Sequence, residues 1–224
     1  AFGIKRPVDS LHMAFLVLGE KKLLELLMAH ISAGLLSGEL PGYQLKCADV
    51  LRHSVWVGIA AEQLATTLEL ETHETLFTAG LLHDIGKIVL DPFLQKEYDR
   101  MHAPEVDEES SESFEQREKS VLGVTHNEAG GKLLEYWKLP EEIPAAIEYH
   151  HSPELAPSYQ QVVNVIHVAD MLAYTQSVGT GVTGIHYNLS EKAVKDLNIT
   201  EDISEYVASQ TVDKMKEILD LLDT

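Results

Sequence analysis

Apolar residues recur along most of this chain at the three- to four-residue spacing of amphipathic helices. Between residues 45 and 68, for example, Leu51, Val55 and Ile59 fall on one helical face. The same spacing predicts helices over 10–36, 45–68, 71–82, 119–137, 141–151, 160–174, 189–197 and 201–222. Few stretches show the alternation that is typical of strands. The pattern therefore predicts an all-α protein built as a bundle of packed helices.

Glycine and proline residues mark the expected breaks between these helices. We expect a loop over 34–42, a helix end or kink at Gly86, and a further break at Pro92. Residues 104–118 form an acidic, serine-rich stretch, which we expect to be a solvated loop or an exposed helix because like charges usually stay in water. No linker signal is strong enough to divide the chain, so residues 1–224 are expected to form one domain.

The chain is strongly acidic, with 17 basic and 36 acidic side chains and a formal net charge of −19. Such a surface repels nucleic acid backbones and anionic membranes, so we expect neither as a partner. No apolar run approaches the ~20 residues of a membrane helix. Cys47 is the single cysteine, which excludes an internal disulfide and a multi-cysteine zinc site. A reducing compartment, the cytoplasm, is the resulting expectation.

Seven residues of metal-ligand type are spaced along the predicted helices. They are His53, His83, Asp84, His126, His150, His151 and Asp170. Imidazole and carboxylate groups suit first-row ions such as iron, manganese, nickel or zinc. Helices in a bundle can direct such side chains into one interior site, so the set predicts a metal centre. The remaining histidines are interpreted as surface or core residues, because a single histidine is more often one of these than a ligand.

Two pairs of these residues are neighbours in sequence, His83 with Asp84 and His150 with His151. Neighbouring side chains on a helix point about 100° apart, from ~3.6 residues per turn. Each pair can therefore address one small site only if it lies at a helix end. Diverging ligands suit a two-metal centre, in which a carboxylate bridges ions ~3.5–4 Å apart and a phosphate is clamped between them.

Two further residues near this set have alternative interpretations. Lys87 is a candidate contact for a substrate phosphate, and a surface lysine is the alternative. His167 lies three residues before Asp170 and is interpreted as a core histidine, with a supporting contact to the metal ligands as the alternative.

The order of the seven residues resembles the HD superfamily of metal-dependent phosphohydrolases. The segment Leu81-Leu82-His83-Asp84-Ile85-Gly86-Lys87 is similar to the core shared by HD-GYP and HDOD proteins. The finer resemblance is to HDOD, the HD-related output domain of bacterial signalling proteins. It is carried by Leu122-Gly123, His126-Asn127-Glu128-Ala129-Gly130, Leu133-Leu134, Trp137, Leu139-Pro140 and His150-His151-Ser152-Pro153. The resemblance covers nearly the whole chain and implies an HD-type helical bundle. It also implies a first subdomain, which we expect to be incomplete or missing here.

The resemblance further implies how the seven residues share two divalent metal ions. One ion would be held by His53, His83, Asp84 and Asp170. Asp84 would bridge to a second ion, held by His126, His150 and His151. No Gly-Tyr-Pro motif follows the histidine pair, which argues against cyclic-di-GMP hydrolysis.

Two functions remain open at this point. In the first, the module is a metal-dependent phosphodiesterase or phosphohydrolase, in which Asp84 and Lys87 act on a phosphoester or nucleotide ligand. In the second, the metal centre is structural or sensory, and the module contacts a signalling protein partner. A helical scaffold with incidental histidines is a third alternative, but ligand-type residues on several helices argue against it.

Overall fold

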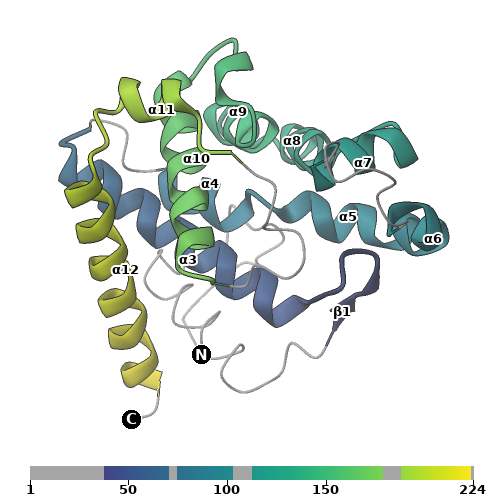
Figure 1. The fold of residues 1–224 in the computed structure, drawn as a ribbon, viewed down its shortest axis with the longest axis horizontal. Coiled ribbons are helices and arrows are strands. Elements are labelled where there is room, and N and C mark those ends of the chain that lie inside the picture. The colour runs from purple at the N-terminus through teal and green to yellow at the C-terminus, as the bar shows by residue number, and fades with distance from the viewer. Residues whose placement is uncertain (1–37, 71–74, 103–112, 179–187, 223–224) are drawn as a thin grey trace, which may run out of the picture.

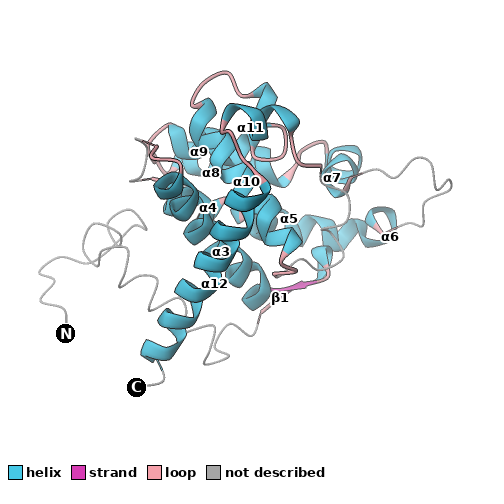
Figure 2. Ribbon diagram, turned by 60° about the vertical axis from the view of Figure 1, so that its left-hand side comes forward, coloured by secondary structure: helices cyan, strands magenta, loops and turns pink. Residues whose placement is uncertain are grey.

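The computed structural model describes residues 38–70, 75–102, 113–178 and 188–222. This part of the chain is mostly helical and begins with a small hairpin (Figures 1 and 2). Its α-helices are α3 (Cys47–Thr67), α4 (Leu76–Leu82), α5 (Ile85–Leu94), α6 (Tyr98–Met101), α7 (Phe114–Leu122), α8 (His126–Tyr136), α9 (Glu142–Tyr149), α10 (Gln160–Thr175), α11 (Glu191–Asp196) and α12 (Glu201–Leu222). The 3-10 helices are η1 (Pro41–Tyr43), η2 (Gln95–Glu97) and η3 (Pro153–Leu155). In the hairpin, β1 (Glu39–Leu40) pairs antiparallel with β2 (Leu45–Lys46). The predicted all-α class is confirmed.

The main core surrounds α3, which packs against α4, α10 and α12 (Figure 1). The apolar face predicted for α3 is confirmed, because Val55, Ile59 and Leu64 are fully buried. Ile147 on α9 and Ile166 on α10 complete the same cluster. Burial of such side chains contributes about 1.5–3 kcal/mol each, so this core is the principal source of stability.

A second, smaller cluster joins the hairpin to α5 and α6. We call it the hairpin cluster, and its buried members are Leu40, Tyr43, Leu45, Val50, Leu90, Leu94 and Met101. Asp91 ties the hairpin to α5, because its Oδ1 accepts a hydrogen bond of 2.8 Å from the backbone N–H of Gly42. Helix α5 therefore spans both clusters, since Ile85 at its first turn packs against the main core.

Two very close helix crossings bring the helix ends together. Where α3 meets α4, a Cβ on Gly80 would lie 2.5 Å from the Cα of Gly58. Where α5 meets α8, a Cβ on Gly86 would lie 1.8 Å from the carbonyl oxygen of His126. Only glycine permits such backbone contact. These crossings set the end of α4 beside the start of α8.

Three helix boundaries differ from the prediction. The single helix expected over 119–137 is two helices, because Gly123 ends α7 at a φ of 76° and a capping box from Thr125 starts α8. Pro92 lies inside α5 rather than breaking it. Proline removes only one backbone hydrogen bond there, because it lacks an N–H group, and the helix ends two residues later. Gly86 also lies inside α5, so the chain breaks before it.

The expectation of solvation for the acidic stretch 104–118 is wrong at its C-terminal end. Glu118 on α7 is fully buried. It lies four residues after Phe114 and three before Val121, so it shares the apolar side of this helix. Its carboxylate accepts hydrogen bonds there, which offset the cost of burying a charge.

Several predictions lie outside the described residues, among them the helix over 10–36, the break at Gly34 and the start of the helix over 71–82. Within the described ranges, no helix combines the length and apolar composition that a bilayer span requires.

Candidate metal centre

The structure brings all seven predicted ligands together in the protein interior. His53 comes from α3, His83 and Asp84 from the junction of α4 and α5, His126 from the start of α8, His150 and His151 from the end of α9, and Asp170 from α10. Six of them are at most 3% exposed, and His151 is partly exposed. Both neighbouring pairs lie at helix ends, as predicted from helical geometry.

One part of the centre lies between α3, α4 and α10. The Nε2 of His53 is 2.9 Å from Oδ1 of Asp170. The Nε2 of His83 is 3.6 Å from the same oxygen and 3.5 Å from Oδ2 of Asp84. His150 also belongs to this part, since it forms a potential ligand group with His83 and Asp170.

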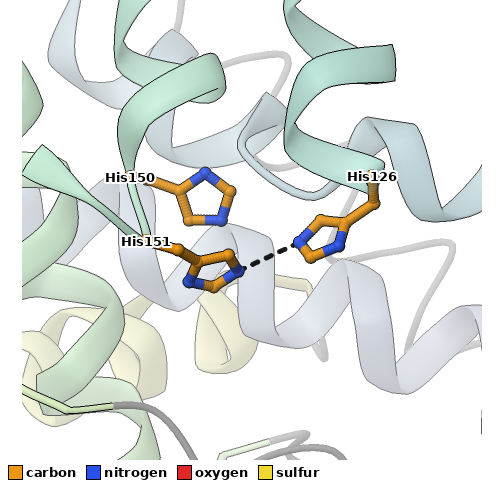
Figure 3. Close-up of side chains that lie close together, drawn as sticks. All are labelled: His126, His150 and His151. Carbon is orange, nitrogen blue, oxygen red and sulfur yellow. Dashed lines mark hydrogen bonds between the residues drawn. The ribbon is translucent and has the colours of Figure 1, made fainter. Parts of the chain in front are cut away.

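The other part joins α8 to the end of α9. His126, His150 and His151 form a second potential ligand group, with the ligand atoms within 4.8 Å of one another (Figure 3). The Nε2 atoms of His126 and His151 are 3.0 Å apart. Asp84 connects the two parts, because its Oδ1 is 3.5 Å from Nε2 of His126 while its Oδ2 faces His83.

Backbone carbonyl groups orient three of the imidazoles. The acceptors are the oxygens of Val178 for His53, Gly80 for His83 and Ile147 for His150, at 3.0, 2.7 and 2.6 Å from Nδ1. A ring that donates from Nδ1 presents Nε2 as its ligand atom. Metal-ligating histidines usually donate their other ring N–H in this way.

His126 is oriented differently, by a side chain. Its Nδ1–H donates to Oε2 of Glu118 at 2.7 Å, and its backbone N–H donates to the same oxygen at 2.9 Å. The other oxygen, Oε1, accepts a hydrogen bond of 2.5 Å from the hydroxyl of Tyr43. Neither Glu118 nor Tyr43 was predicted as part of the site, although the position of Glu118 on the apolar side of its helix was a local signal.

Unpartnered polar atoms indicate that these residues fit a metal ion. His83 Nε2, Asp84 Oδ1, His150 Nε2 and Asp170 Oδ2 are buried and have no hydrogen-bond partner in the described part of the chain. Such atoms are costly to bury unless something satisfies them. A cation would satisfy all four, and imidazole nitrogens with carboxylate oxygens are donors that divalent metals accept.

Both carboxylates are held in the ionised form. Burial by itself raises the pKa of Asp84, but Lys87 and the neighbouring imidazoles, with His83 foremost, hold that pKa well below its usual range. Burial also raises the pKa of Asp170, but the neighbouring imidazoles of His53 and His83 keep it well below its usual range. Metal ligands must be deprotonated, so both groups are in the required form at neutral pH.

The imidazoles at the end of α9 are held neutral. Burial lowers the pKa of His150 to about 3, and His83 adds to this shift. Burial and the neighbouring His150 lower the pKa of His151 well below its usual range. The pKa of His83 is raised, because Asp84 and Asp170 outweigh the effect of burial. His150 and His151 are therefore already in the neutral form that a metal ligand requires.

Lys87 is neither a surface lysine nor exposed toward solvent. It is 2% exposed, and its Nζ donates to Oδ2 of Asp84 at 2.7 Å. The ammonium group is thus the counter-ion of a candidate bridging ligand. Its predicted contact with a substrate phosphate stays a prediction.

His167 supports the centre through the main chain. Its Nδ1–H donates to the carbonyl oxygen of His150 at 2.7 Å, and its Nε2 accepts from the N–H of Ser190 at 2.9 Å. It is a core histidine, as interpreted from the sequence, and it also fixes the backbone beside a candidate ligand.

Comparisons with known proteins agree with this architecture. An HDOD domain protein of unknown function from Geobacter sulfurreducens is 25% identical, with a TM-score of 0.60 over 98% of this chain and 72% of its own. A candidate signal transduction protein from Marinobacter aquaeolei VT8 is 20% identical, with a TM-score of 0.64 over 97% of this chain. This chain spans only 48% of the Marinobacter protein.

A candidate phosphohydrolase from Shewanella amazonensis SB2B is 21% identical, with a TM-score of 0.51 over 91% of this chain and 77% of its own. At these identities, the Marinobacter and Shewanella proteins support the fold alone. No match was found among curated proteins. The family model of the HDOD domain matches residues 1–153, and the chain therefore belongs to the HDOD family.

Proposed function

We propose that this chain is an HDOD signalling module, folded as one domain, whose interior holds two divalent metal ions and hydrolyses a phosphoester. The observation that carries the proposal is the set of buried ligand atoms, on His83, Asp84, His150 and Asp170, that have no protein partner in the described residues. The names of the Marinobacter and Shewanella proteins are consistent with signalling and phosphohydrolase roles.

The proposed division of ligands draws on three overlapping groups, namely His53 with His83 and Asp84, His83 with His150 and Asp170, and His126 with His150 and His151. His53, His83, Asp84 and Asp170 would hold one ion, and His126, His150 and His151 the other. Asp84 would bridge them, which its two oxygens support by facing opposite groups. His150 also lies close to His83 and Asp170, so it is the ligand most open to reassignment.

Two bound divalent ions would supply Lewis acidity toward a phosphoester and toward water. The chain's own residues prepare this chemistry. Asp84 is ionised and held in place by Lys87, which we also propose as a contact for the substrate phosphate. His151 is the partly exposed member of the set, so a phosphoester or nucleotide would approach beside it.

The test begins with metal content. We expect elemental analysis of the purified protein to show two divalent ions per chain, from among iron, manganese, nickel and zinc. The loaded protein is then assayed on a panel of nucleotides, phosphomonoesters and cyclic dinucleotides. An Asp84→Asn variant should lose both the metal and any turnover. A fully loaded protein without turnover on the panel would contradict the hydrolytic part.

A second candidate function is a metal-dependent interaction module without turnover. Two observations favour it, namely the burial of six of the seven ligands and the missing Gly-Tyr-Pro after His151. Here the output would be contact with a signalling protein partner. It predicts that metal removal weakens partner binding while the loaded protein turns over no phosphoester. In either case Cys47 is compatible with our expectation of the cytoplasm.

A further inference from the structure

Glu118 is a fully buried carboxylate that lies outside the set of seven ligands. Three donors surround it, namely the backbone N–H and the Nδ1–H of His126, and the hydroxyl of Tyr43. A buried carboxylate is costly unless such hydrogen bonds compensate it. Each of the two oxygens of Glu118 therefore has at least one hydrogen-bond donor.

The start of α8 stabilises the carboxylate. His126 is the first residue of that helix, and the first N–H groups of a helix have no partner within it. The helix macrodipole also places partial positive charge at this end. Oε2 of Glu118 accepts one of these N–H groups together with the ring N–H of the same residue. The backbone and the ring of His126 are thus both held by Oε2 of Glu118.

This contact determines which nitrogen of His126 faces the metal centre. With the proton on Nδ1, Nε2 is directed at Nε2 of His151 and at Oδ1 of Asp84, 3.0 and 3.5 Å away. A carboxylate acceptor also raises the basicity of the ring as a ligand, which a neutral carbonyl does less strongly. His53, His83 and His150 have carbonyl acceptors, so this effect falls on His126.

We propose that Glu118 is a positioning residue, which sets the tautomer and ligand strength of His126 and makes metal binding there depend on the hairpin residue Tyr43. The inference rests on the proposed metal centre and deepens it. Tyr43 is buried in the hairpin cluster, and the adjacent Gly42 is bonded to Asp91. The hairpin thereby reaches a candidate metal ligand through a single carboxylate.

The first test needs neither a variant nor a metal. Nitrogen-15 NMR of the imidazoles, recorded on metal-free protein above the ordinary pH range of imidazole titration, identifies the protonated ring nitrogen. We expect a proton on Nδ1 of His126. An unprotonated Nδ1 would overturn the inference, whatever the metal does.

The second test compares Glu118→Gln with Glu115→Gln. The amide oxygen of glutamine can accept both hydrogen bonds from His126, and its NH2 group can donate to the Tyr43 hydroxyl, but the charge is lost. The fold should therefore survive, as circular dichroism checks. Glu115 is on the same helix and has no hydrogen bond to His126 among those described, although their charges interact. It therefore controls for a general loss of negative charge near the ring.

Cobalt(II) titrations of the metal-free proteins are followed by visible absorption and by metal content after dialysis. We expect Glu118→Gln to weaken one of the two cobalt equivalents by about 10–100-fold, and Glu115→Gln to change either by less than about threefold. Equal weakening in both variants, or none in Glu118→Gln, would overturn the inference. Failure of the wild-type protein to bind cobalt would instead count against the proposed metal centre itself.

Discussion

The main core and the hairpin cluster hold the candidate metal ligands in different ways. In the main core, backbone carbonyls orient His53, His83 and His150, and a carbonyl moves only when its own segment moves. Next to the hairpin cluster, the side chain of Glu118 orients His126. A side chain can change rotamer without unfolding a helix. One part of the candidate centre is therefore oriented by the backbone, and the other by a side chain that itself contacts the hairpin residue Tyr43.

The largest expected effect comes from removing the residue that serves both parts. Asp84→Ala leaves Lys87 buried without its counter-ion, which costs about 3–5 kcal/mol. We expect this loss in the free energy of unfolding, measured with urea on metal-free protein. Both metal equivalents should also be lost.

The matched control is the double variant Asp84→Ala/Lys87→Met. It removes the unpaired ammonium as well, so it should recover part of the stability but no metal binding. A single variant that is as stable as the wild type would show that Lys87 finds another partner.

A somewhat smaller loss of stability should follow from forcing α5 and α8 apart where they cross at Gly86. In Gly86→Ala the new Cβ would meet the carbonyl oxygen of His126 at 1.8 Å, so α8 must move away from α5. Overpacking of this kind typically costs about 1–3 kcal/mol, which thermal unfolding measures. The part near His126 should lose its metal while the part near His53 keeps it. Equal loss from both parts would contradict the proposed division.

Acid should weaken the metal-free protein through His150. Its pKa is about 3 in the folded state against about 6.5 when unfolded, so the unfolded state binds more protons between these values. Stability therefore falls as the pH drops through this window, and His150 alone contributes up to about 1.4 kcal/mol per pH unit. His151, whose pKa is also lowered well below its usual range, adds a loss of the same sign. Asp84 and Asp170 have lowered pKa values, and they add a loss only below about pH 4.

His83 acts in the opposite direction, because its pKa is raised in the folded state. Its contribution is fully present below about pH 6.5 and is lost as the pH rises through the folded pKa. Urea unfolding at a series of pH values measures the sum. A His150→Asn variant should lose less stability as the pH falls from about 6.5 to about 3. An unchanged pH dependence in that variant would show that other groups cause the acid destabilisation.

The smallest effect on metal affinity should come from Tyr43, the hairpin residue that donates to Glu118. Tyr43→Phe removes one hydrogen bond to the carboxylate and keeps the ring in the hairpin cluster. We expect a loss of about 1.5–3 kcal/mol in stability, the range for a hydrogen bond to a charged group. The change in metal affinity should be smaller than in Glu118→Gln and confined to the same equivalent. Cobalt titration checks this, and an effect on the other equivalent would contradict the separation of the two parts.

Local signals in the sequence predicted much of the fold. The apolar spacing predicted α12 over 201–222, as the structure has it, and α10 to within one residue. The break between α7 and α8 was missed, although Gly123 and the capping box at Thr125 are both visible in the sequence. Such boundaries are short-range features, which turn and cap residues encode locally in the sequence.

For the candidate site too, some features were predicted from the sequence and others were seen only in the structure. The seven ligand-type residues followed from side-chain chemistry, and the position of the two neighbouring pairs at helix ends followed from helical geometry. The role of Glu118 did not, because it depends on α7 lying against the start of α8. The close approach at Gly86 is likewise a contact between two helices, α5 and α8. Lys87 and Asp84 are only three residues apart, but that both are buried is seen only in the folded structure.

The sequence by itself determined the helical class, most helix positions and the set of residues able to bind a metal. These properties depend on residue type and on spacings of a few positions along the chain. Only the tertiary structure decided which helices cross, which nitrogen of each imidazole faces the centre, and which carboxylates stay charged in the interior. Those properties depend on the distances between atoms far apart in the chain, and on the loss of water around them.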